Sequence, residues 1–456
     1  MIVVSHRGPV TFRAREDETF EARRGAGGVV SALGPLLARR EDVRWIAAAI
    51  SEDDRAAVAT DAARASDFDL RLLALDREAH RLHYDVISNS TFWFLFHGLY
   101  DLPRRPLYDR RWRDAWHGYV AVNQAFAEAV AETAPESDTV LLQDLHLMLV
   151  PGILRETRPD LHVTHFTHTP FCGPNTIRVL PDYAAHAICA SLAVCTAGFH
   201  TERWANAFRA SARSVLGPHG AVGRTYAASF GPDPEALADD LATPEVQQAI
   251  AALEERVGDR ALVVRSDRME LSKNVVRGFH AYDLMLEEHP ELRERVVFAA
   301  LLNPSRESLP EYQAYRNEVE RAAARVNERW ARPGWEPVWL DTRDNYARSV
   351  AGLVCSDVLL VNPVRDGLNL VAMEGPLVNR HDGVVCLSRD AGAYEVLEGG
   401  CIMVHPYDVV QTAAALHEGL MMEPAERAVR AARLRQAAVS SPPTVWLETQ
   451  IRQATS

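Results

Sequence analysis

Two cations lie five residues apart in the segment SDRMELSKN (266–274), which follows an apolar run typical of a buried strand. Arg268 and Lys273 form this pair, and Lys273 is the one lysine among 49 basic residues. A lone ammonium in an arginine-rich chain points to a position where a forked guanidinium does not serve. The segment leads into an expected helix, whose N-terminus favours anions. The pattern predicts a diphosphate site; a surface ion pair of Arg268 with Asp267 or Glu270 is the alternative.

A second segment of chemical interest, NPVRDGLNLVAMEGPLVN (362–379), passes from a buried strand through a turn into a helix. Gly367 permits a tight turn, and the backbone N–H groups of residues 368–370 are then expected to point into a crevice and cradle a phosphate. Glu374, one helical turn further on, could accept hydrogen bonds from a ribose. An Asp-Gly turn is common by itself. The turn becomes informative because it is expected at the same edge of the crevice as Arg268 and Lys273.

Two polar residues follow neighbouring strands that are expected in the first half of the chain. TVLLQD (139–144) ends at Asp144 and HVTHF (162–166) leads to His168, with one helical crossover over 146–156 between them. Adjacent parallel strands would bring the two side chains together. A carboxylate suits a sugar hydroxyl, and an imidazole can donate to a hydroxyl or a phosphate. A capping Asp and a satisfied core His are the plainer alternative.

Arg7 and a glycine-rich stretch, RRGAGGVVSAL (23–33), follow the first expected strand, and the glycines would let the backbone approach a phosphate or a sugar closely. The segment YDVISNSTFWFLFH (84–97) then brings Tyr84 and Trp93 together in a mixture of side chains suited to stacking on a sugar ring. A flexible loop and an aromatic core are the ordinary explanations of these two stretches.

Apolar runs that alternate with helical patterns predict parallel βαβ units in both halves of the chain. The expected strands lie at 2–5, 45–50, 139–144 and 162–166, and then at 261–267, 295–303, 337–341, 357–363 and 383–388. We therefore expect an α/β fold of two Rossmann-like, doubly wound domains with ligands at the carboxyl ends of their strands. A Gly-, Pro- and Asp-rich linker is expected at 217–240.

Composition excludes several other classes of protein. The 456 residues are 47% hydrophobic and 24% charged, enough for two cores of roughly 200 residues each. A formal charge of -13 disfavours a surface-wide attraction to nucleic acid or to anionic lipid. Six scattered cysteines show neither a disulfide framework nor a zinc motif, and no apolar run has the length of a membrane span. We expect a cytoplasmic enzyme.

In order along the chain, these segments resemble the trehalose-6-phosphate synthases, retaining glycosyltransferases with the GT-B fold. The matching stretches are SHRGPV, GAGGVVSAL, NSTFWFLFH, QDLHLMLVPGILR, HFTHTPF, SDRMELSKN, PSRESLPEYQAYRNEVE and RDGLNLVAMEG. Together they are far more specific than any one of them. The resemblance implies two Rossmann-like domains that face a central cleft: an acceptor-binding domain at 1–225, a nucleotide-sugar-binding domain at 226–440, and a C-terminal helix at 441–456 that packs back on the first.

The resemblance also implies roles for individual residues. The catalytic group comprises Arg268, Lys273, His168 and Asp144. The donor-binding group comprises Gly28, Asp366, Gly367, Leu368, Asn369, Leu370 and Glu374. The group that holds the acceptor sugar phosphate comprises Arg7, Tyr84, Trp93 and Arg316. Cations and N–H groups can stabilise the charge of a departing nucleoside diphosphate, so no metal, no other cofactor and no protein nucleophile are expected.

By the same resemblance, the partners are small-molecule substrates. They are a nucleoside diphosphate glucose, with GDP or UDP as the carrier, and glucose 6-phosphate, and the product is trehalose 6-phosphate with retention. No nucleic acid and no membrane partner are expected. Whether the chain forms a homo-oligomer, which base the donor carries and how far the domains close stay open.

Departures from the common family text keep alternatives open. Asn274 stands where many members have Gly, and Met373 lies in a stretch where the commoner text is DGMNLVAKE. EGPLVN also resembles the pseudo-glycosyltransferases, which join a nucleotide-linked cyclitol to an aminocyclitol phosphate through a C–N bond. The intact set of Tyr84, Trp93 and Arg7 is more similar to a sugar synthase. A catalytically silent nucleotide-sugar sensor is a third hypothesis.

Overall fold

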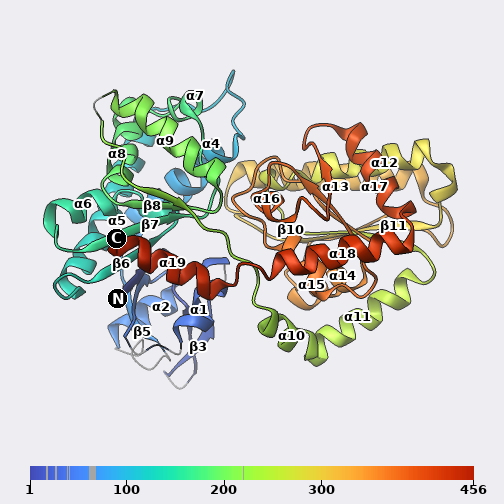
Figure 1. The fold of residues 1–456 in the computed structure, drawn as a ribbon, viewed down its shortest axis with the longest axis horizontal. Helices are drawn as coiled ribbons and strands as arrows, with labels where there is room; N and C mark the ends of the chain where they lie inside the picture. Colours follow the sequence, from blue (N-terminus) through green and yellow to red (C-terminus); the bar gives the residue numbers. More distant parts are fainter. Residues whose placement is uncertain (17–18, 26–27, 39, 41, 61–67, 219) are drawn as a thin grey trace. The chain divides into compact units, whose positions relative to one another are not determined.

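The computed structural model describes residues 1–16, 19–25, 28–38, 40, 42–60, 68–218 and 220–456 (Figure 1). The chain forms two units, one of Met1–Phe230 with Pro443–Ser456 and the other of Gly231–Pro442. Each unit has a parallel sheet with helices on both faces, which is the Rossmann-like arrangement expected from the sequence.

The first unit contains a seven-stranded parallel sheet in the order β5-β4-β1-β6-β7-β8-β9. Its strands are β1 (Ile2–Val4), β4 (Arg44–Ala48), β5 (Asp69–Leu73), β6 (Thr139–Gln143), β7 (His162–Thr167), β8 (Thr196–Phe199) and β9 (Thr225–Ala227). A separate antiparallel hairpin consists of β2 (Val10–Ala14) and β3 (Phe20–Arg24). Because helices cover both faces of the sheet, its central strands contain buried apolar runs, IVV in β1 and VLL in β6.

The helices of the first unit fill the connections between these strands. They are α1 (Gly28–Leu37), α2 (Glu52–Ala59), α3 (Arg77–Arg81), the π-helix η2 (Leu82–Phe92), α4 (Trp93–His97), α5 (Arg110–Thr133), η3 (Leu145–Leu147), α6 (Val150–Thr157), α7 (Pro174–Ile177), α8 (Asp182–Ala193), α9 (Glu202–Leu216) and the C-terminal α19 (Pro443–Thr455). Phe126 and Val130 of α5 share a buried apolar cluster with Val140 and Leu142 of β6. This cluster anchors the strand that ends at Asp144.

The second unit contains a six-stranded parallel sheet in the order β12-β11-β10-β13-β14-β15. Its strands are β10 (Ala261–Arg268), β11 (Val296–Asn303), β12 (Val338–Asp341), β13 (Val358–Val361), β14 (Val384–Ser388) and β15 (Ile402–Val404). Its helices are α10 (Pro234–Ala242), α11 (Pro244–Val257), η4 (Leu271–Lys273), α12 (Val275–Glu288), η5 (Pro290–Leu292), α13 (Pro310–Trp330), α14 (Tyr346–Cys355), α15 (Val371–Val378), α16 (Tyr394–Leu397), α17 (Val409–Met421) and α18 (Pro424–Ala438). The strands β10 and β13, which precede the two donor-site segments, are neighbours in this sheet.

The chain leaves and re-enters the first unit at Phe230 and Pro443, close to the boundaries at 225 and 440 that the resemblance implies. Within the second unit, the N–H of Gly231 donates to the carbonyl oxygen of Ser441 at 2.7 Å, so the segments at the two passages are hydrogen-bonded. A Cβ at position 231 would collide with a neighbouring carbonyl oxygen, so this close approach requires glycine. The linker expected at 217–240 includes β9 and the start of α10. The helix α19 packs against β6 and β7.

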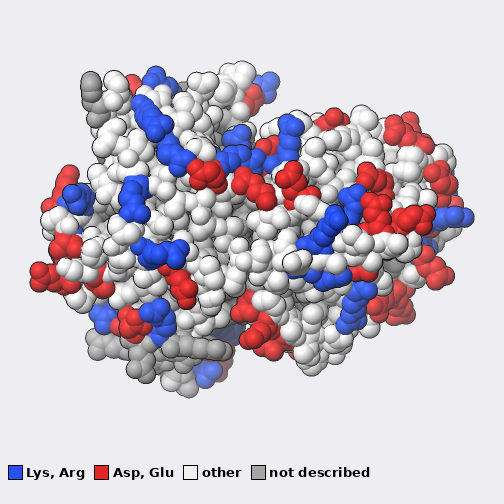
Figure 2. Space-filling view, viewed as in Figure 1, with Lys and Arg blue, Asp and Glu red and all other residues white. Residues whose placement is uncertain are grey.

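Charged side chains of both signs are interspersed over the face shown in Figure 2, without a broad basic field. All six cysteines are buried free thiols. Within the described residues, every helix is too short or too polar to cross a membrane.

Candidate active site

The cation pair lies where β10 ends, as expected from the sequence. Arg268 is the last residue of β10, and its Nη1 lies 2.8 Å from Oε1 of Glu270. The Glu270 side chain is fully buried, whereas 51% of the Arg268 side chain is exposed. Arg306 Nη1 and Ser305 Oγ also donate to Oε1 of Glu270, at 2.8 and 2.7 Å. The ion pair with Glu270, which the sequence analysis gave as the alternative, is therefore present. It involves a buried carboxylate, and about half of the Arg268 side chain stays exposed.

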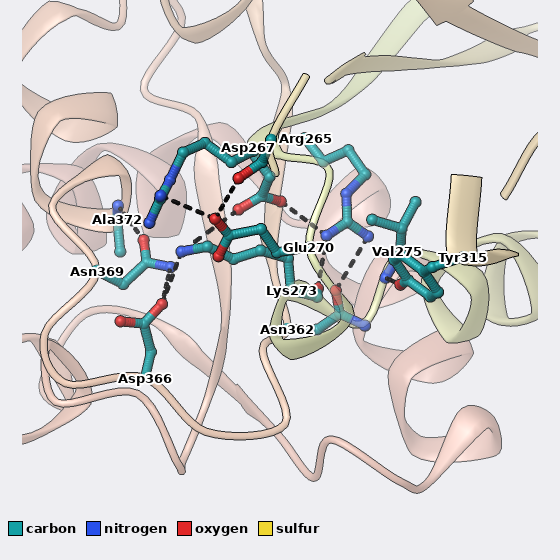
Figure 3. Close-up of polar contacts among 12 residues, drawn as sticks. Arg265, Asp267, Glu270, Lys273, Val275, Tyr315, Asn362, Asp366, Asn369 and Ala372 are labelled. Atoms are coloured by element: carbon teal, nitrogen blue, oxygen red, sulfur yellow. Dashed lines mark hydrogen bonds and ion pairs between the residues drawn. The ribbon is translucent and has the colours of Figure 1, made fainter. Parts of the chain in front are cut away.

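Lys273 closes a short 3-10 turn and points at the second donor-site segment (Figure 3). Its Nζ lies 2.7 Å from Oδ2 of Asp366 and 4.0 Å from Oδ1 of Asp267. Burial alone would lower the pKa of Lys273, but these two carboxylates raise it above its usual value. The ammonium therefore stays charged, and the structure brings together two segments that are 93 residues apart.

A buried arginine, which the sequence did not single out, fixes the position of this lysine. Arg265 lies in β10 with a fully buried side chain. It donates to Oδ2 of Asp267 at 2.7 Å, to the carbonyl oxygen of Lys273 at 2.8 Å and to Oδ1 of Asn362 at 3.3 Å (Figure 3). Asn362 follows β13, so one guanidinium ties the ends of two strands to the turn that carries Lys273. In the sequence, Arg265 looks only like a polar interruption of an apolar strand.

Asn274 explains how this turn tolerates the absence of glycine. Its φ is 59°, in the left-handed region that glycine and, less readily, asparagine adopt. Its Nδ2 donates to the carbonyl oxygens of Asn362 and Pro406, at 3.0 and 2.6 Å. Helix α12 begins at the next residue, and the N–H of Val275 donates to the hydroxyl oxygen of Tyr315 at 2.8 Å. The side chain of Asn274 thus supplies contacts that a glycine would lack.

The loop that follows β13 presents unbonded N–H groups beside Lys273. Asn369 has a φ of 78°, and its Nδ2 donates to Oδ2 of Asp366 at 3.1 Å. The N–H groups of residues 368–370 donate no hydrogen bond to another described residue. A Cβ on Gly392 would collide with the carbonyl oxygen of Gly367, so this loop packs closely against the backbone at Gly392. These features agree with a nest for an anion.

Glu374 lies on the first turn of α15, directly after this loop. Burial, and then the negative charge of Asp240, raise the pKa of Glu374 to about 7. A carboxyl group with such a pKa is ready to exchange hydrogen bonds with hydroxyl groups near neutral pH. Its role toward a ribose stays a prediction.

In the first unit, Asp144 and His168 lie side by side at the ends of β6 and β7. The N–H of His168 donates to Oδ1 of Asp144 at 3.3 Å, and its Nε2 lies 2.9 Å from Oε1 of Gln143. Asp144 has a φ of 73°, a strained conformation for a residue other than glycine. Burial, and then the rings of His200 and His165, lower the pKa of His168 well below its ordinary value. The imidazole is therefore neutral.

The expected acceptor residues of the first unit include a direct pair. Nη2 of Arg7 donates to the hydroxyl oxygen of Tyr84 at 3.3 Å. Tyr84 belongs to the π-helix η2, and such wide turns are rare and concentrate at functional sites. Trp93 begins α4, and its ring stacks on His97 at 4.1 Å between centroids.

Two further expected site residues belong to other helices. Arg316 belongs to α13 of the second unit, where Glu307 and Glu320 accept from it at 2.6 and 3.0 Å. An acceptor phosphate would have to compete with these two carboxylates. Gly28 is the first residue of α1, and the two residues before it, 26–27, lie outside the described residues.

A family model described as glycosyltransferase family 20 matches residues 1–456. The chain belongs to glycosyltransferase family 20. The alpha,alpha-trehalose-phosphate synthase (UDP-forming) A of Dictyostelium discoideum is 31% identical over 438 residues, which cover 94% of this chain and 58% of that protein. The family 20 chain thus spans less than two thirds of that relative's length.

Solved structures place the family 20 chain in the GT-B fold. An alpha,alpha-trehalose-phosphate synthase (UDP-forming) from Burkholderia vietnamiensis has a TM-score of 0.84 and 29% identity, and the match covers 100% of this chain and 99% of that one. An Escherichia coli structure named as trehalose-6-phosphate bound with UDP-2-fluoro glucose has a TM-score of 0.83 and 26% identity, and the match covers 100% and 98%. The resemblance to the trehalose-6-phosphate synthase family is confirmed, and this chain is a glycosyltransferase.

Proposed function

We propose that this family 20 glycosyltransferase transfers glucose from a nucleoside diphosphate glucose to glucose 6-phosphate, with retention, and so forms trehalose 6-phosphate. The observation that carries the proposal is the cation pair of the second unit, with Arg268 and Lys273 beside the unbonded N–H groups of residues 368–370. This set suits a diphosphate that leaves with growing negative charge. The relatives described above are named trehalose-phosphate synthases, and one solved structure is named with UDP-2-fluoro glucose.

In the proposed reaction, the bond between the anomeric carbon and the donor's phosphate oxygen breaks. An acceptor hydroxyl oxygen bonds to that carbon on the same face, and the departing phosphate oxygen takes the hydroxyl proton. No protein base is assigned. Lys273 keeps its proton, because Asp366 and Asp267 raise its pKa, and serves as a fixed positive charge. Each such interaction contributes on the order of 10²-fold to the rate.

The first unit supplies the polar groups proposed to contact sugar and phosphate. The Asp144 carboxylate can accept from sugar hydroxyls, and the neutral His168 imidazole can exchange a hydrogen bond without adding charge. Arg7 and Tyr84 are proposed to hold the phosphate of the acceptor, since a guanidinium and a phenol can both donate to it. These contacts orient the substrates.

We also propose that the reaction needs no metal ion, because Arg268, Lys273 and the loop N–H groups provide the countercharge. Among the described residues, one group could hold a metal: His289, Glu291 and His417. The two imidazoles of that group are stacked 3.5 Å apart, and none of its residues has a proposed substrate contact. Treatment with EDTA should leave the rate of nucleoside diphosphate release unchanged. A loss of activity that a divalent cation restores would contradict this.

The decisive experiment is a product assay with the purified chain and glucose 6-phosphate. UDP-glucose, GDP-glucose and ADP-glucose are supplied separately, and nucleoside diphosphate release and product NMR are followed together. We expect α,α-linked trehalose 6-phosphate, with UDP-glucose tested first because the relatives are named UDP-forming. Absence of product with all three donors, despite binding of a nucleoside diphosphate, would overturn the proposal.

A further inference from the structure

A stack of aromatic rings lies beside Arg7 in the first unit. The buried ring of His6 lies nearly parallel to the ring of Tyr84, with centroids 4.8 Å apart and planes 12° apart. It is also nearly parallel to His146, at 4.7 Å and 14°. His80 is a third neighbour, and its Nε2 lies 2.8 Å from Nε2 of His6. The loop after β1, the helix α3, η2 and η3 therefore meet at one imidazole.

The geometry requires at least one of His6 and His80 to be neutral. In a hydrogen bond between two Nε2 atoms, one ring donates and the other accepts. The buried Nδ1 of His6 has no hydrogen-bond partner among the described residues, nor has Nδ1 of His83, whose ring stacks on Tyr119. Burial lowers the pKa of His6 well below its ordinary value, and the neighbouring imidazoles and Arg7 lower it further.

The surroundings of His80 and His83 also disfavour a proton on these two rings. Burial, and then the guanidinium of Arg55, lower the pKa of His80. Burial lowers the pKa of His83 to about 3, although its Nε2 lies 2.8 Å from the carbonyl oxygen of His146. Oδ2 of Asp144 lies 3.9 Å from Nδ1 of His146. Around neutral pH, the rings of His6, His80 and His83 are therefore uncharged.

The stack carries the residues assigned above to the acceptor. Tyr84 lies against His6, and its hydroxyl oxygen accepts from Arg7. We propose that His6 is a positioning residue, which acts through the ring of Tyr84 to hold the Tyr84 hydroxyl and the Arg7 guanidinium in place for the phosphate of the acceptor. The inference rests on the proposed function, because it requires a phosphorylated acceptor at Arg7.

A proton on His6 disrupts this arrangement. The imidazolium would lie beside the guanidinium of Arg7 and next to His80, with no buried carboxylate in contact to compensate it among the partners described above. Acceptor binding therefore requires a neutral His6, and burial keeps this ring neutral at pH 7.5. A comparison of variants at this pH isolates the contribution of the His6 ring.

The test measures KM for glucose 6-phosphate, KM for the donor and kcat at pH 7.5. His6→Ala removes the ring, and we expect acceptor KM to rise about 3- to 10-fold at pH 7.5, the range that one aromatic contact supplies, with donor KM unchanged. His6→Asn keeps a donor toward His80 but cannot titrate. We expect its acceptor KM to lie between those of the wild type and His6→Ala, because the contact with His80 is kept and the ring is lost.

His162→Asn is the matched control. It makes the same His-to-Asn change at an exposed histidine, at the start of β7. It should keep the wild-type KM values and kcat. Wild-type turnover tests the proposed function separately, since a wild type without product would contradict that function and not the role of His6. With an active wild type, an unchanged acceptor KM in His6→Ala would overturn the inference, as would a donor KM that rises as much as the acceptor KM. If His6→Ala fails to fold in a melting experiment, His6→Asn decides.

Discussion

Nζ of Lys273 lies 2.7 Å from Oδ2 of Asp366, across the gap between the turn after β10 and the loop after β13. Asp366 also accepts from Nδ2 of Asn369, so its carboxylate holds both sides of the proposed anion site together. A diphosphate that reaches Lys273 must share this ammonium with Asp366. The site is therefore ordered and charged before the donor arrives, which removes the cost of arranging it during the reaction.

The first prediction concerns this ammonium. Lys273→Ala should lower kcat by about 10²-fold or more, because a fixed charge at the leaving group is lost. Lys273→Arg should recover only part of that loss, since a planar guanidinium cannot replace a compact ammonium between Asp366 and Asp267. Initial rates of nucleoside diphosphate release measure both. Arg321→Ala, at an exposed position on α13, is the control and should match the wild type. Turnover unchanged in Lys273→Ala would show that this lysine takes no part in the reaction.

The second prediction concerns the buried carboxylate below Arg268. Burial would raise the pKa of Glu270, but the guanidinium groups of Arg268 and Arg306 hold it at about 2. Glu270→Gln should therefore lower the free energy of unfolding by about 3 kcal/mol at pH 7, because it removes the carboxylate that pairs with the buried guanidinium of Arg306. Urea-induced unfolding followed by circular dichroism measures the loss.

The sign of its pH dependence follows from the lowered pKa. The stabilisation by Glu270 is present above the ordinary value of 4.5 and is lost as the pH falls from there toward 2. The difference between wild type and Glu270→Gln should thus be equal at pH 7 and pH 6 and smaller at pH 4. A difference that does not change down to pH 4 would mean that Glu270 is not held ionised by the two arginines.

Buried central strands could be predicted from the sequence because both of their faces are covered. All nine expected strands, such as β10 and β11, occur in the two sheets. The strands β5, β8, β9 and β15 and the hairpin of β2 and β3 were not expected. These elements are short or carry charges, for example DLRLL in β5 and FEARR in β3, so their apolar pattern is weak and their tertiary neighbours decide.

Some residues of the candidate site could likewise be predicted from the sequence, and others could not. Arg268, Lys273 and the loop at 366–370 could be found because they directly follow apolar strands, where parallel sheets gather ligand-binding groups. Arg265 and His6 could not, since their importance comes from partners distant in the chain, such as Asn362, 97 residues away. A polar residue in an apolar strand becomes informative only when its hydrogen-bond partners are known. Whether each predicted residue contacts a substrate stays a prediction.

The third prediction concerns Asn274 and its φ of 59°. Asn274→Gly can keep this conformation but loses the hydrogen bonds to Asn362 and Pro406, so we expect a loss of about 1–2 kcal/mol in the free energy of unfolding. Asn274→Ala loses the same bonds but, unlike the Gly variant, keeps a Cβ in the left-handed region, so it should be about 1 kcal/mol less stable than Asn274→Gly. Urea unfolding of the three proteins should rank them wild type, Gly, Ala. An Ala variant as stable as the Gly variant would contradict the strain argument.

The fourth prediction concerns Glu374, whose pKa is raised from 4.5 to about 7 by burial and by Asp240. Between these two values the folded chain keeps a proton that the unfolded chain releases, so this stabilisation is present below pH 4.5 and is lost as the pH rises through 7. Glu374→Gln cannot ionise, and its Tm should exceed that of the wild type by about 2–4 °C at pH 8 and equal it at pH 4. Glu255→Gln, at an exposed position on α11, should show neither effect.

The same substitution separates stability from binding. If the Glu374 carboxylate accepts hydrogen bonds from the ribose, as proposed, Glu374→Gln should weaken the binding of a nucleoside diphosphate by about 3- to 10-fold at pH 8, although the variant is more stable. Calorimetric titration of both proteins at pH 8 measures this. A variant that is more stable but binds the nucleoside diphosphate as tightly as the wild type would show that Glu374 does not contact the donor. A variant that is weaker but no more stable would show that Asp240 and burial do not strain the carboxylate.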